Sequence, residues 1–121
     1  MAKVLCVDDV SSNLGLARDV VSRVEGVEVV LANNVHTALD LAKVHAPQVI
    51  VLDILMPQMD GYELLRKLKA LPELSKSRYI ALTALARPED QTQALTAGFH
   101  HYISKPFDIL ELMQVVRAFL R

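Results

Sequence analysis

The sequence contains no tryptophan, one cysteine and only four glycines among its 121 residues. A single cysteine cannot form an internal disulfide, and Cys6 lies in an apolar run, where a small buried side chain is expected. No apolar run approaches the ~20 residues of a membrane-spanning helix, and the N-terminus lacks the basic and apolar regions of a signal peptide. We therefore expect a soluble, cytoplasmic protein with no membrane partner.

An excess of charge of one sign is also absent. The chain has 13 basic and 14 acidic residues, a formal net charge of −1. This balance provides no positive field for nucleic acid or anionic lipid, so direct nucleic-acid binding is not expected. The length suits one domain spanning residues 1–121, and a hydrophobic fraction of 52% suits a sheet covered on both faces.

Short apolar runs that end in polar residues are the main feature of the chain. The run at 49–52 is too short for a helix and is typical of a strand buried on both faces, ending at Asp53. Polar residues in the second and fifth runs, such as Glu28, place those strands at the sheet edges. The other predicted strands are 4–7, 27–32, 79–82 and 101–104.

Helical patterns alternate with these strands, and most begin at a capping residue. Gly26 is expected to end the first helix, and Pro72 the third. The expected first residues or caps are Ser11 or Ser12, Asn33 or Asn34, Asp60, Pro88 in a first turn, and Asp108.

The fourth helix has the weakest apolar face. Its anchors are Ala94, Leu95 and Ala97, and a buried alanine contributes much less than a leucine at ~25 cal/mol per Å2. It should therefore be the least firmly docked helix. The fifth helix is expected to face the core with Ile109, Leu112, Met113 and Val116.

Five strands alternating with five helices predict an α/β fold, because right-handed crossovers make the sheet parallel and cover both faces. Ranking the strands by apolar character gives the order 2-1-3-4-5 of a flavodoxin-like three-layer sandwich. Ligands bind such sheets outside the carboxyl ends of the strands, at the switch point between the first and third strands. Asp8, Asp9 and Asp53 are expected to flank that point.

The same sheet edge carries Thr83 and Lys105 together with the three aspartates. Crowded carboxylates repel by several kcal/mol per pair at ~4 Å and an effective dielectric near ~20, so Mg2+ or Mn2+ is expected to offset them, helped by Lys105. A divalent ion, a carboxylate, an amine and a hydroxyl are the parts of a phosphoryl-transfer site. Asp53 is the predicted nucleophile.

Four motifs in order along almost the whole chain resemble those of one family: Val7-Asp8-Asp9, Asp53 followed by Met56-Pro57 and Asp60-Gly61, Thr83-Ala84, and Lys105-Pro106-Phe107. They resemble the receiver domain of two-component response regulators of the chemotaxis-regulator type. The resemblance implies a phosphorylation-operated signalling switch that catalyses its own phosphorylation and dephosphorylation, and not an enzyme acting on a separate substrate. The implied partners are a histidine kinase or histidine phosphotransfer protein and a downstream target protein.

The resemblance also implies roles for single residues. Asp53 would be phosphorylated by a phosphohistidine or a small phosphodonor. Asp9, Asp53 and the backbone carbonyl of Leu55 would bind Mg2+, with Asp8 assisting through water. Lys105 would pair with a phosphoryl oxygen, and its bond to Pro106 would be cis.

The resemblance further implies a switch in which the Thr83 hydroxyl closes on the phosphoryl group and Tyr102 turns inward. The surface of the fourth helix, fifth strand and fifth helix would change as a result. Leu55 and Leu85, each two residues beyond a site residue, are expected to flank the phosphoryl group and to slow attack by water.

Simpler interpretations remain open for single residues. Asp8 and Asp9 could cap the first helix, and His100-His101 lacks further metal ligands at suitable spacing and is expected to be exposed.

A haloacid-dehalogenase-type enzyme would need a second carboxylate two residues after Asp53, where Leu55 stands. An FMN carrier would not place two aspartates at the phosphate, and a phosphorylation-independent interaction domain would not need the intact site.

Overall fold

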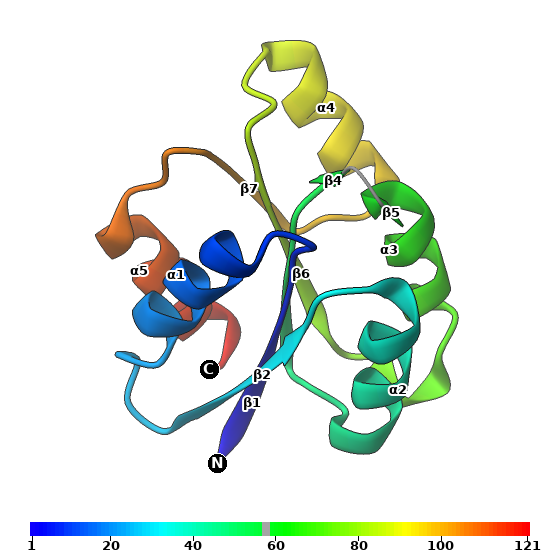
Figure 1. The fold of residues 1–121 in the computed structure, drawn as a ribbon, viewed down its shortest axis with the longest axis vertical. Coiled ribbons are helices and arrows are strands. Elements are labelled where there is room, and N and C mark those ends of the chain that lie inside the picture. Colours follow the sequence, from blue (N-terminus) through cyan, green and yellow to red (C-terminus); the bar gives the residue numbers. More distant parts are fainter. Residues whose placement is uncertain (57–58) are drawn as a thin grey trace.

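The computed structural model describes residues 1–56 and 59–121. A five-stranded parallel sheet runs through the middle of the molecule (Figure 1). Its order, β2-β1-β3-β6-β7, confirms the predicted 2-1-3-4-5 arrangement. Pro57 of the Met56-Pro57 motif lies outside the described residues. The strands are β1 (Ala2–Val7), β2 (Val27–Ala32), β3 (Val49–Leu52), β6 (Arg78–Thr83) and β7 (His101–Ser104).

Strand β3 is the centre of the sheet, as its sequence predicts. All four of its residues are buried, and it pairs in parallel with β1 on one side and β6 on the other. Val51, for example, lies opposite Cys6 and Ile80. The more polar strands β2 and β7 occupy the edges. The most apolar strand therefore lies in the buried centre of the sheet, and the more polar strands lie at its edges.

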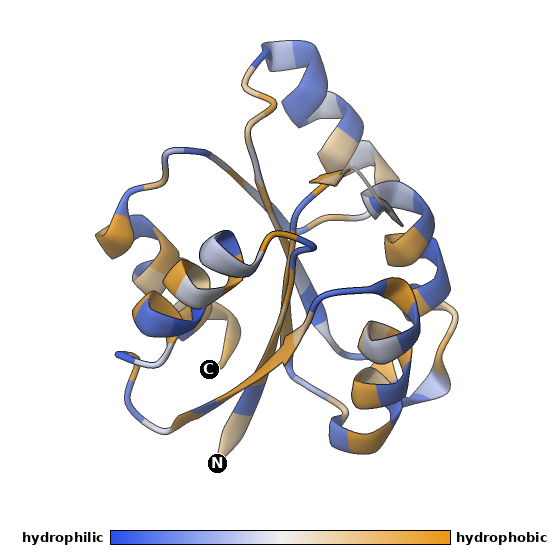
Figure 2. Cartoon of the chain, viewed as in Figure 1, coloured by the Kyte–Doolittle hydropathy of each residue, from blue (hydrophilic) through white to orange (hydrophobic). Residues whose placement is uncertain are grey.

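Helices cover both faces of the sheet, which gives three layers (Figure 1). Buried leucine and valine side chains of α1 and α5 form a core with one face, and α2, α3 and α4 contribute to a second core on the other. The helices are α1 (Ser11–Val21), α2 (Val35–His45), α3 (Gly61–Lys69), α4 (Pro88–Ala97) and α5 (Ile109–Phe119), with a short 3-10 helix η1 (Pro72–Leu74). Figure 2 shows the hydrophobic colours concentrated along the strands and the inner sides of the helices.

Three of the expected helix caps are confirmed. The side chain of Asn34 accepts the backbone N–H of Thr37 at 2.8 Å, and Asp60 and Asp108 cap α3 and α5 in the same way. The expected serine cap of the first helix is wrong. Val10 occupies that position, and the Asp8 side chain accepts the Val10 N–H at 2.9 Å in the preceding turn.

The helix ends and faces also depart from expectation in places. Helix α1 ends at Val21, and Gly26, with φ of +80°, lies in the turn that leads into β2. On α5, Leu112 and Val116 are buried, but Ile109 at the start of the helix is 41% exposed. The first turn of α5 therefore lies beyond the core.

Helix α4 buries less than even its weak pattern predicts. Of the three expected anchors, only Ala94 is buried, and Leu95 and Ala97 are exposed. Between β3 and α3 the chain also forms an antiparallel ribbon, β4 (Leu55–Met56) with β5 (Met59–Asp60), that was not expected. Two-residue strands are too short to produce a periodic signal.

Over the ranges 1–56 and 59–121, none of the helices has the length and apolar character needed to cross a membrane.

Candidate functional site

Backbone hydrogen bonds continue past the ends of the strands and fix the carboxyl edge of the sheet. The N–H of Asp8 donates to the carbonyl of Ala32 at 3.2 Å, and that of Asp53 donates to the carbonyl of Val7 at 3.2 Å. The N–H of Lys105 donates to the carbonyl of Thr83 at 2.7 Å. Each side chain of the site therefore starts from a backbone position that its neighbouring strand holds.

Lys105 joins two aspartates that are far from it in the sequence. Its Nζ lies 2.7 Å from Oδ2 of Asp53 and 3.1 Å from Oδ2 of Asp8. Both aspartates are 6% exposed, so these are buried charge-assisted hydrogen bonds. The structure thus brings together three of the residues that the sequence predicts for one site.

Local turns orient the acceptor side chains. Oδ1 of Asp53 accepts the N–H of Leu55 at 3.0 Å, and Oγ1 of Thr83 accepts the N–H of Leu85 at 3.3 Å. The bond from Val10 to Oδ1 of Asp8 has the same form, two residues along the chain. In both aspartates one carboxylate oxygen is held by backbone and the other faces Lys105. This division fixes the rotamers of the two carboxylates.

Burial and charge act against each other at the Asp53–Lys105 pair. Burial raises the pKa of Asp53, and the hydrogen bond and charge of Lys105 offset this only in part. Burial acts to lower the pKa of Lys105, but the bonds and charges of Asp53 and Asp8 outweigh it and raise that pKa. Lys105 is therefore held as a cation, and two carboxylates compete for it.

Gly61 lets α3 begin directly against the site. A Cβ atom at this position would lie 2.5 Å from Cα of Ile54 and 2.7 Å from the carbonyl oxygen of Asp53. Such contacts are far shorter than van der Waals separation, so a larger residue would push the Asp53–Ile54 segment aside. The Asp60-Gly61 pair of the sequence thus combines a helix cap with the close approach that positions Asp53.

The remaining predicted residues lie at or near the same edge. Thr83 is completely buried at the end of β6, and Asp9 is half-buried in the loop after β1. The Lys105–Pro106 peptide bond is cis, as the resemblance implies. Tyr102 is half-buried, and its hydroxyl finds no hydrogen-bond partner among the residues that the structure describes. The functional roles of these residues stay predictions.

Asp90 is a buried acidic residue that the sequence analysis missed. It lies in the first turn of α4, is 6% exposed, and accepts hydrogen bonds from the guanidinium and backbone N–H of Arg87. Burial raises the pKa of Tyr62 and of Tyr102, and the Asp90 charge adds to both effects. The capping-box signature begins with Ser, Thr, Asp or Asn, and Arg87 is none of these, so the sequence carries no signal that Asp90 is buried.

The donor set at the edge suits a hard cation in its chemistry. Asp8 and Asp53 share one ammonium group, so the pair keeps a negative charge in a buried setting. Carboxylate oxygens are the ligands that Mg2+ and Mn2+ prefer. Throughout the described part of the chain, no group of three or more His, Cys, Asp or Glu side chains is arranged to hold a metal ion.

Comparisons with known proteins find relatives over nearly the whole chain. Residues 4–117 match the model of the response regulator receiver domain. An uncharacterized 14.6 kDa protein of Leptolyngbya boryana is 40% identical over 116 residues, which are 96% of this chain and 88% of that protein. The polar-differentiation response regulator DivK of Brucella anthropi is 34% identical over 117 residues, 97% of this chain and 94% of DivK.

Solved structures show the same fold. The chemotaxis protein CheY4 of Vibrio cholerae superposes with a TM-score of 0.88 at 28% sequence identity, and the match covers 98% of both chains.

Proposed function

The chain belongs to the response regulator receiver domain family of two-component signalling, and on that basis we propose that Asp53 is its phosphoacceptor. The phosphoryl group would come from a phosphohistidine on a histidine kinase or phosphotransfer protein, or from a small phosphodonor. The observation that carries the proposal is the position of Lys105 Nζ, 2.7 Å from Asp53 and 3.1 Å from Asp8. An ammonium group held this close to Asp53 is in position to pair with a phosphoryl group that Asp53 accepts.

The transfer needs one new bond and one broken bond. An Asp53 carboxylate oxygen attacks phosphorus, and the bond from phosphorus to the donor breaks, with its electron pair leaving on the donor. Lys105 is held protonated and pairs with the Asp53 carboxylate before the transfer. The acyl phosphate no longer carries that carboxylate charge, so Lys105 then pairs with a phosphoryl oxygen. Asp8, Asp9, Asp53 and the carbonyl of Leu55 would hold Mg2+ or Mn2+, Asp8 through water, and the ion would neutralise phosphoryl charge.

The signal would then pass from Thr83 to the surface formed by α4, β7 and α5. Thr83 stands at the end of β6, immediately before the loop that leads to α4. In the proposed switch the Thr83 hydroxyl binds the phosphoryl group, and the side chain of Tyr102 on β7 turns inward. The weak anchoring of α4 supports this proposal, because elements with little buried apolar area move at low cost. A downstream target protein would read the changed surface.

Intact-mass measurement tests the proposed phosphoacceptor. The protein is incubated with acetyl phosphate and Mg2+, and the wild type is compared with Asp53→Asn. The wild type should gain the mass of one phosphoryl group and the variant none. A chemically similar control, Asp60→Asn, alters an exposed cap of α3 and should still be phosphorylated. Phosphorylation of Asp53→Asn, or turnover of added phosphomonoesters, would contradict the proposal.

We further propose that Leu55 and Leu85 lengthen the life of the aspartyl phosphate. Their backbone N–H groups donate to Asp53 and Thr83, which places both residues next to the site, and Leu55 is 57% exposed. Apolar side chains there would hinder an attacking water. Leu55→Asn should shorten the phosphoryl half-life several-fold, measured by loss of the phosphorylated mass after the donor is removed. An unchanged or longer half-life would contradict this role.

A further inference from the structure

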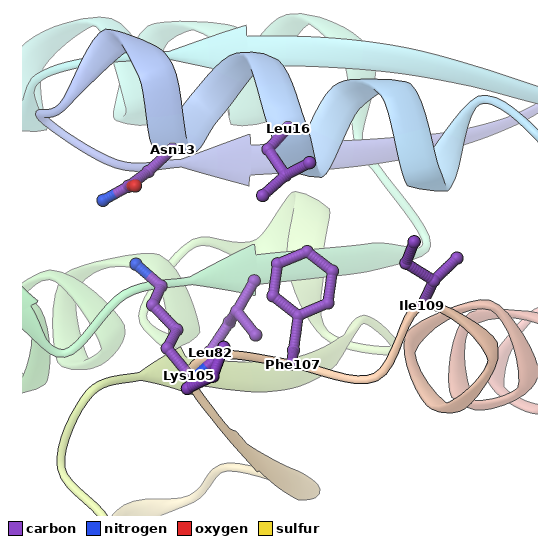
Figure 3. Close-up of a pocket in the computed structure, with 7 residues that line it drawn as sticks. Asn13, Leu16, Leu82, Lys105, Phe107 and Ile109 are labelled. Carbon is purple, nitrogen blue, oxygen red and sulfur yellow. The ribbon is translucent and has the colours of Figure 1, made fainter.

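An apolar cavity of about 460 Å3 lies beside the site. Its walls come from helix α1, strand β6, the segment between β7 and α5, and the first residue of α5. Figure 3 shows Leu16 of α1 facing Phe107 across the cavity, with Asn13 and Lys105 near each other at one end and Ile109 at the other. The volume falls within the ~300–1,000 Å3 of small-molecule sites.

One end of the cavity lies at the ammonium-bearing side chain of Lys105. Lys105 lines it and also contacts Asp53 and Asp8 through Nζ. Asn13 and Leu82 line both this cavity and a much smaller gap whose walls include Asp8 and Asp53. A ligand bound in the cavity would therefore have one end next to the phosphoacceptor.

The walls change from polar to apolar along the cavity. Lys105 and Asn13 supply the polar groups at one end, and leucine, proline, phenylalanine and isoleucine side chains line the rest. Leu16 is 51% exposed and Ile109 is 41% exposed. Apolar surface left open inside a concavity favours an apolar ligand, because covering it removes that surface from water.

We propose that this cavity receives the leaving group of a small phosphodonor, namely an acyl phosphate whose acyl group is apolar and larger than a methyl group. The inference rests on the proposed function, since it names the donor class for the same aspartate. The anionic phosphoryl end lies at Lys105, and the apolar end lies toward Ile109. The ligand thus has the same polarity gradient as the walls.

The reaction balances without any further reactant. An oxygen of Asp53 forms a bond to phosphorus as the bond between phosphorus and the acyl oxygen breaks. The electron pair of that bond leaves with the acyl group as a carboxylate anion. No proton, oxidant or reductant is needed, and the leaving carboxylate departs from the apolar cavity into water.

A rate comparison with two donors tests the inference. Acetyl phosphate and cyclohexanecarbonyl phosphate both release alkyl carboxylates of similar basicity, so their intrinsic reactivities are alike. Rates of phosphoryl incorporation are measured by intact mass, with Mg2+, at equal concentrations below saturation. Burial of the larger acyl group should make cyclohexanecarbonyl phosphate roughly ten-fold faster.

Two exposed leucines give a matched pair of variants. Leu16→Asn places a polar group on the cavity wall, and the ratio of the two rates should fall toward one. Leu110→Asn makes the same change at a residue that is 65% exposed on α5 and lies outside the cavity wall. It should leave both rates as they are in the wild type.

The possible outcomes separate the two proposals. Phosphorylation by neither donor would overturn the small-donor assignment, and the proposed function would fall only if a phosphohistidine protein also failed to phosphorylate Asp53. Equal rates with both donors, or a ten-fold preference that survives Leu16→Asn, would overturn the cavity assignment alone. If Leu16→Asn slowed only transfer from a phosphohistidine protein, the cavity would belong to a protein partner, and the small-donor assignment would also fail.

Discussion

Helices α3 and α4 pack on the same face of the sheet but are anchored in different ways. α3 buries Leu64, Leu65 and Leu68 completely or nearly so, whereas Ala94 is the only buried apolar residue of α4. At about 1.5–3 kcal/mol for each fully buried leucine, α3 gains several kcal/mol that α4 does not.

Local bonds replace core contacts in α4. The Arg87 guanidinium and backbone N–H bind the buried carboxylate of Asp90, and Lys69 of α3 donates to the carbonyl of Gly98 at 3.2 Å. The first set lies within the helix terminus, so it moves with the helix, and the second holds only its C-terminal end. The comparison indicates that α4 can shift at its N-terminal end, next to Thr83, while α3 stays fixed.

Truncation of a leucine in each helix is the strongest test of this difference. Leu68→Ala should lower the free energy of unfolding by about 2–5 kcal/mol, because it leaves a cavity in the core. Leu95→Ala on α4 removes a side chain that is 44% exposed and should cost less than ~1 kcal/mol. Urea denaturation of both variants measures the two effects. Similar losses would mean that α4 is anchored as firmly as α3.

Most of this fold could be predicted from the sequence because the apolar runs, the polar edge strands and the helical patterns all indicate the same arrangement. Apolar runs of four to six residues identified the strands, and the polar residues of β2 and β7 placed them at the edges. Asp8, Asp53 and Lys105 could be assigned to one site because parallel strands end at the same sheet edge. Their contacts through one ammonium group are the outcome of that alignment.

The features that escaped prediction depend on competition between neighbouring groups. Ser11 and Ser12 are good caps by residue type, but the turn that Asp8 forms with Val10 moves the cap position to Val10. Asp90 has the pattern of a solvated first-turn acid, and only the tertiary fold shows that it is buried. Such local choices are settled by packing, which single-residue propensities do not contain.

Phosphorylation should sharpen the contrast between the two helices. Amide hydrogen exchange of α4 should change by about five-fold when Asp53 is phosphorylated, whereas exchange of α3 should stay the same. Thr83→Ala should remove the response of α4 while Asp53 is still phosphorylated, because the proposed hydroxyl contact is missing. Exchange measured by mass spectrometry, with phosphorylation checked by intact mass, makes this comparison. Equal changes in α3 and α4 would contradict it.

Loss of the Arg87–Asp90 contacts should produce a smaller, local effect. Asp90→Asn keeps the size of the side chain but removes the charge that binds the guanidinium. Amides in the first turn of α4 should then exchange faster, and those of α3 should not. The hydrogen-bonded guanidinium lowers the pKa of Asp90, so the wild type should show the same loss when the carboxyl is protonated at low pH. Glu73→Gln, an exposed acid-to-amide change on η1, is the control.

The smallest expected effect is a pH dependence at the end of α4, where His100 follows Gly98 and Phe99. Its Nδ1 accepts the backbone N–H of Tyr79 at 3.0 Å, so this nitrogen is unprotonated in the fold. Burial lowers the pKa of His100, and the charges of Lys69 and Arg78 act in the same direction.

Because the folded-state pKa of His100 lies below the unfolded value of ~6.5, its contribution is complete above that pH. The contribution is lost as pH falls through the folded-state pKa. His100→Asn supplies an acceptor that does not titrate, so the wild type should lose more stability than this variant between pH 7 and 5, by less than ~1 kcal/mol for one solvent-screened hydrogen bond. Equal pH profiles for wild type and His100→Asn would show that this bond does not hold the end of α4.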